Sequence, residues 1–145
     1  MNRALLIQVR GQILDHPETW SPEAPASVLR GRQTYSTAGW TVILAHHPHV
    51  PFFLYDPPKH AEPEPSKFPH AVARNQPADM VETHRGVAHQ YVLAGHEPES
   101  VNDAAMAVLG ISQEQADRLF DVHQTWHDTG FALTELIELA AHENA

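Results

Sequence analysis

The chain has 145 residues, of which 42% are hydrophobic and 19% charged, with a net charge of −9 at pH 7. This composition is typical of a globular protein, and with the length it predicts a single domain over residues 1–145. The absence of cysteine excludes disulfides, thiol catalysis and thiolate metal sites, so a reducing, cytoplasmic location is expected. No apolar stretch is long enough to cross a bilayer, so we expect no membrane partner.

The first third of the sequence predicts two helices separated by a loop. Apolar residues at helical spacing predict a helix over 3–15, which Pro17 ends. Two prolines and a glycine predict a loop over 21–33. The segment 36–45 begins with the cap candidate Ser36 and is apolar on nearly every side, which predicts a helix in the middle of the core.

Eight of the twelve prolines lie in residues 48–77, and that density excludes a regular helix. We therefore predict a proline-rich loop insertion over 48–79, in which residues 52–55 form a short edge strand or a plug in the core. Aromatic side chains on a stiff backbone make efficient contacts with a protein partner. The candidate partner-binding aromatics are Phe52, Phe53, Tyr55 and Phe68.

Between residues 80 and 93 the hydrophobic period changes to two, which predicts a β-hairpin with its turn at Arg85 and Gly86. A helix through 81–94 is the rival interpretation. In the hairpin register one face carries Glu82, His84, Val87, His89 and Tyr91.

The last third of the sequence predicts three helices. The first follows the cap candidate Ser100 and ends at Gly110, and the second begins at a capping box formed by Ser112 and Gln115. The third helix is predicted over 129–141. The fold class is therefore α+β and mostly helical, with about five helices, one small β-hairpin and a proline-rich loop.

The negative charge is concentrated in the last third. Residues 97–145 carry ten acidic residues and one basic residue, whereas acidic and basic residues balance in 1–96. Such a surface repels phosphate backbones and attracts a basic protein face, although a merely solvated helical face has the same composition. The candidate partner-binding acids are Glu114, Asp117 and Asp121.

Two short stretches carry a resemblance. Ala38-Gly39-Trp40, followed by LGISQEQADRLF over 109–120, is similar to small uncharacterised proteins of actinobacteria and their phages. In that group a CxAGWA helix precedes a hairpin and an AAxxLGLTxxQAxxLF helix pair. The resemblance covers 3–45 and 80–121, and Ser36 and Thr37 stand where the group tends to place a cysteine. It implies a small cytosolic α+β protein with no established activity.

The helix pair over 105–120 also permits a helix-turn-helix DNA-binding interpretation, with Gly110 in the turn. The second helix would be the recognition helix, and its only basic residue is Arg118. Phosphate contacts supply much of the affinity for DNA, so nucleic acid is a disfavoured partner. A DNA-binding regulator remains the first alternative function.

Twelve histidines raise a second alternative, a metal-dependent enzyme. A spacing of four residues puts His123 and His127 on one face if both lie on a helix, and His84 and His89 share a face of the predicted hairpin. No HExxH or comparable signature ties two of them to a general base. Surface and capping histidines explain the same composition, and we predict no cofactor.

The sequence also lacks a nucleophile elbow, a Walker loop and a dinucleotide-binding glycine motif. The preferred prediction is therefore a small, non-enzymatic cytosolic accessory protein of phage or mobile-element origin. It would bind a host protein through a basic surface of that partner.

Overall fold

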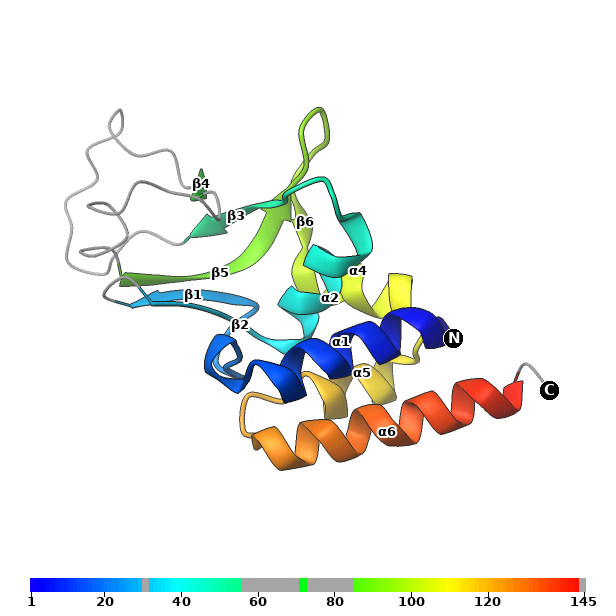
Figure 1. The fold of residues 1–145 in the computed structure, drawn as a ribbon. Helices are drawn as coiled ribbons and strands as arrows, with labels where there is room; N and C mark the ends of the chain where they lie inside the picture. Colours follow the sequence, from blue (N-terminus) through cyan, green and yellow to red (C-terminus); the bar gives the residue numbers. More distant parts are fainter. Residues whose placement is uncertain (30–31, 56–70, 73–84, 144–145) are drawn as a thin grey trace.

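The computed structural model describes residues 1–29, 32–55, 71–72 and 85–143. This part of the chain contains five α-helices, one short 3₁₀ turn and a six-stranded antiparallel sheet, so the α+β, mostly helical fold class is confirmed. Figure 1 shows the strands gathered on one side of the molecule and helices α1, α5 and α6 on the other. None of the described helices combines the length and the apolar character that a membrane crossing needs.

Helix α1 spans Arg3–Asp15, as predicted, and it buries four apolar side chains: Leu5, Leu6, Val9 and Ile13. Helix α6 spans Trp126–Glu143 and lies alongside α1 (Figure 1). The Trp126 indole N–H donates to the Ile13 carbonyl at 2.9 Å, which fastens the start of α6 to α1. Helix α6 therefore begins three residues before the predicted 129–141.

Helix α2 spans Thr37–His46 and is buried all round, as its apolar sequence predicts. The Ser36 hydroxyl accepts the Gly39 N–H at 3.2 Å and caps the helix. The 3₁₀ turn η1, Pro17–Thr19, packs beside it, and the Trp40 indole donates to the Thr19 carbonyl at 3.3 Å. A Cβ at Gly39 would lie 2.0 Å from the Pro25 carbonyl oxygen, so only glycine fits there.

The sheet runs in the order β2-β1-β5-β3-β4, and β6 pairs with β5 beside this path. The strands are β1 (Ala26–Leu29), β2 (Arg32–Tyr35), β3 (Phe52–Tyr55), β4 (Ala71–Val72), β5 (Arg85–Val92) and β6 (Glu99–Ser100). The predicted loop over 21–33 is therefore wrong over 26–29 and 32–33, because β1 and β2 pair with each other and β1 pairs with β5. These four-residue strands gain their stability from distant partners, which local sequence does not show.

The predicted turn at Arg85 and Gly86 is also wrong, since both residues lie in β5, opposite Leu29 and Val28. The rival helix fails over 85–92 for the same reason. Residues 80–84 lie outside the described part of the chain, so the first arm of the predicted hairpin is not described. Strand β5 is instead the centre of the sheet and pairs with β1, β3 and β6.

A β-bulge in β5 changes which residues face the core. Tyr55 pairs with Ala88 and Leu54 pairs with Gln90, so His89 is an extra residue in β5. Ala88 and Tyr91 are buried as a result, and His89 is exposed. The predicted face shared by Val87, His89 and Tyr91 is therefore wrong.

Strand β3 lies between β5 and β4 and is an inner strand rather than the predicted edge strand. The neighbouring prolines permit this, because none of them falls inside Phe52–Tyr55. Of the predicted 48–79 insertion, the structure describes only 48–55 and 71–72.

Helices α4 (Val101–Leu109) and α5 (Gln113–Leu119) form the predicted helix pair. Gly110 ends α4 in the left-handed conformation with φ +69°. The capping box is present, because Ser112 Oγ accepts the Gln115 N–H at 3.1 Å and Gln115 Oε1 accepts the Ser112 N–H at 2.9 Å.

Candidate functional site

A groove of about 410 Å³ runs between α4 and α5. It is formed by two stripes of residues that recur at helical spacing and therefore lie on facing sides of the two helices. On α4 the stripe consists of Asn102, Asp103 and Met106. On α5 and just beyond its end it consists of Gln113, Ala116, Asp117, Phe120 and Asp121.

Six of the nine residues that line the groove are polar, three of them the carboxylates that form its acidic rim, and three are apolar. Ala116 is buried and packs in the core, while Met106 and Phe120 are half-buried and pack against the core from the groove side. The rim carries the carboxylates of Asp103, Asp117 and Asp121, and none of the described lining residues is basic. The groove therefore places three carboxylates beside the half-buried side chains of Met106 and Phe120.

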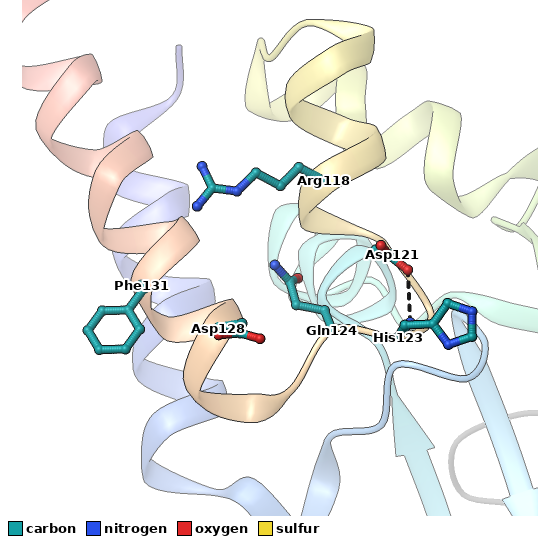
Figure 2. A pocket seen from close by; sticks show the side chains of 6 residues that line it. All are labelled: Arg118, Asp121, His123, Gln124, Asp128 and Phe131. Carbon is teal, nitrogen blue, oxygen red and sulfur yellow. Dashed lines mark hydrogen bonds between the residues drawn. The ribbon is translucent and has the colours of Figure 1, made fainter.

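Two of the rim carboxylates are held in place by hydrogen bonds that leave their charge uncompensated. Gln113 Nε2 donates to Asp117 Oδ1 at 2.7 Å, and the His123 backbone N–H donates to Asp121 Oδ1 at 2.9 Å (Figure 2). Among the described residues, the Asp103 side chain has no hydrogen-bond or ion-pair partner. All three carboxylates are thus available to a cationic ligand.

A second hollow, of about 280 Å³, lies between the end of α5 and the start of α6, and Asp121 borders both hollows. Figure 2 shows the side chains that line it: Arg118, Asp121, His123, Gln124, Asp128 and Phe131. The aromatic ring of Phe131 points outward from α6, away from the other five (Figure 2).

Arg118, which lines this second hollow, already forms an ion pair. Arg118 Nη1 donates to Glu135 Oε2 at 2.6 Å, a contact that lowers the pKa of Glu135 and raises that of Arg118. Both side chains are exposed, so the pair contributes little to stability, but it directs the guanidinium toward α6. The positive charge of Arg118 therefore does not neutralise the groove between α4 and α5.

The predicted acidic residues divide between the groove and open surface. Asp117 and Asp121 line the groove, whereas Glu114 is exposed in the first turn of α5 and does not line it. Asp103 and Met106 belong to the groove and were not among the predicted site residues. The three-residue spacing from Asp103 to Met106 in the sequence could have indicated both residues, because it places their side chains on one face of α4.

The predicted aromatic site is corrected in part. Phe53 and Tyr55 are 0% and 3% exposed, so both rings belong to the core and do not reach a partner. Burial also raises the pKa of the Tyr55 hydroxyl. Phe52 is 39% exposed on the opposite face of β3, and Phe68 lies outside the described residues. The alternation of side chains along a strand explains this division.

The predicted histidine pairs do not assemble. His123 lies in the turn before α6 and His127 in the first turn of that helix, so the two do not share a helical face. His127 packs edge-on against Trp126, with ring centroids 4.9 Å apart. His89 is exposed at the bulge and His84 lies outside the described residues. Within the described ranges, no three His, Asp or Glu side chains are grouped so that they could hold a metal ion.

The helix pair has the geometry of a turn at Gly110, as the helix-turn-helix alternative requires. Its second helix presents Glu114 and Asp117, and its base Arg118 is bound to Glu135. A helix with this charge repels a phosphate backbone, so no observation favours DNA binding.

One further polar cluster joins α2 to the sheet. The Tyr91 hydroxyl donates to Glu99 Oε2 at 3.0 Å, and His46 Nε2 lies 3.4 Å from the Tyr91 hydroxyl oxygen. Burial, followed by the bond to Glu99, raises the pKa of Tyr91 to about 12. Glu99 directly precedes Ser100, which caps α4, so this cluster helps to fix the start of the helix that forms one wall of the groove.

Comparison of the chain with protein-family models gives no match, and comparisons with curated proteins and with solved structures give none either. The resemblance to actinobacterial and phage proteins therefore stays a prediction.

Proposed function

We propose that this chain is a non-enzymatic protein-binding module that docks a basic surface of another protein in the groove between α4 and α5. The observation that supports this function is the set of three uncompensated carboxylates, Asp103, Asp117 and Asp121, that line one groove. Cationic side chains of a partner gain attraction at these carboxylates, and their aliphatic stems can pack against Met106 and Phe120. A cytoplasmic location and a host protein as the partner belong to the same proposal.

The electrostatics of the groove also set the mode of association. Carboxylates at an exposed rim attract a basic partner and so speed up its encounter with the groove. This attraction weakens as the ionic strength rises. Affinity should therefore fall steeply with salt. The same rim disfavours nucleic acid and anionic lipid as partners.

The test is a pull-down with the groove charges removed. Asp103→Asn, Asp117→Asn and Asp121→Asn together keep the shape and hydrogen-bonding capacity of the rim but remove its charge. The matched control is Asp15→Asn, Glu18→Gln and Glu23→Gln, three exposed acids remote in sequence from α4 and α5 that change the net charge equally. A basic protein retained by the natural chain and by the control, but lost with the groove variant, supports the function.

The opposite pattern contradicts the proposal. If every retained protein remains bound to the groove variant, or if the control loses the same proteins, the groove is not the docking site. Retention of duplex DNA by the natural chain at low salt would favour the regulator alternative instead.

A further inference from the structure

We draw no further inference here: the strongest candidate, the outer surface of the packed helices α1 and α6 with the exposed side chains of Ile7 and Phe131, carries no proposal because nothing in the described part of the structure shows what covers it.

Discussion

At the scale of single residues, Gly39 shows how one missing side chain determines the packing of a helix. The Pro25 carbonyl accepts the Ser36 N–H at 3.2 Å and comes so close to α2 that a Cβ at position 39 would lie 2.0 Å from its oxygen. The Ser36 cap, the carbonyl and the glycine therefore form one local arrangement that holds β1 against α2. The close approach of the Pro25 carbonyl explains why glycine stands at the centre of the Ala38-Gly39-Trp40 motif.

Gly39→Ala should lower the free energy of unfolding by about 3 kcal/mol or more, since the added methyl group collides with backbone. Helix propensity alone predicts the opposite sign, a gain of about 1 kcal/mol. The matched control is Gly11→Ala in α1, where a Cβ meets no atom within 4 Å, and a small gain is expected there. Urea denaturation measures both, and an equal gain at the two positions would contradict the close approach of Pro25.

Tyr91→Phe should lower the free energy of unfolding by about 1 to 2 kcal/mol at neutral pH, because it removes the hydrogen bond to the Glu99 carboxylate. The pKa of Tyr91 is raised to about 12, so above pH 10 the unfolded chain loses this proton before the folded chain does. Stability should therefore fall as the pH rises from 10 toward 12, and less steeply in Tyr91→Phe. Parallel pH dependences in urea titrations of the two proteins would refute this role for Tyr91.

At the scale of elements, α6 has two clearly different faces. Leu133, Leu136, Ile137 and Ala140 face α1 and the core, as the periodicity of the sequence predicts. Phe131 is 68% exposed on the other side, although its neighbour Leu133 is 0% exposed. Hydrophobicity alone therefore does not identify the buried face of this helix, whereas the period does.

Leu133→Ala should cost about 2 to 5 kcal/mol in unfolding free energy, because it leaves a cavity in the contact between α1 and α6. Phe131→Ala removes a larger side chain only two residues away but should change stability by less than about 0.5 kcal/mol. Thermal and urea denaturation compare the pair directly. A large loss in Phe131→Ala with a small loss in Leu133→Ala would mean that α6 is rotated about its axis.

The sequence predicts a helix or strand well when the interactions that stabilise it join residues close together in the chain. The Ser112 and Gln115 capping box and the Gly110 stop are local chemistry, and both are confirmed. The pairing of Val28 with Gly86 joins residues far apart in the chain, and no local pattern encodes it. The groove is intermediate, because Asp117 lies on a predictable helix face but meets Asp103 only through the packing of α4 on α5.

At the scale of the whole molecule, the net charge of −9 is unevenly distributed along the chain. Residues 97–145, which include helices α4 and α5, carry ten acidic residues and one basic residue. Both walls of the groove therefore belong to the part of the chain that holds the excess negative charge. If the groove binds a basic partner as proposed, this charge adds a long-range attraction that weakens as the ionic strength rises.

The extra residue at His89 determines how strand β5 responds to the deletion of one amino acid. Ala88 and Tyr91 face the same side of the sheet, although three positions separate them, because β5 carries one residue more than β3 over this stretch. Without residue 89, Ala88, Gln90 and Tyr91 would lie opposite Tyr55, Leu54 and Phe53 in regular alternation, and Tyr91 would keep its inward position and its bond to Glu99. Strand β5 should thus keep its register when residue 89 is deleted.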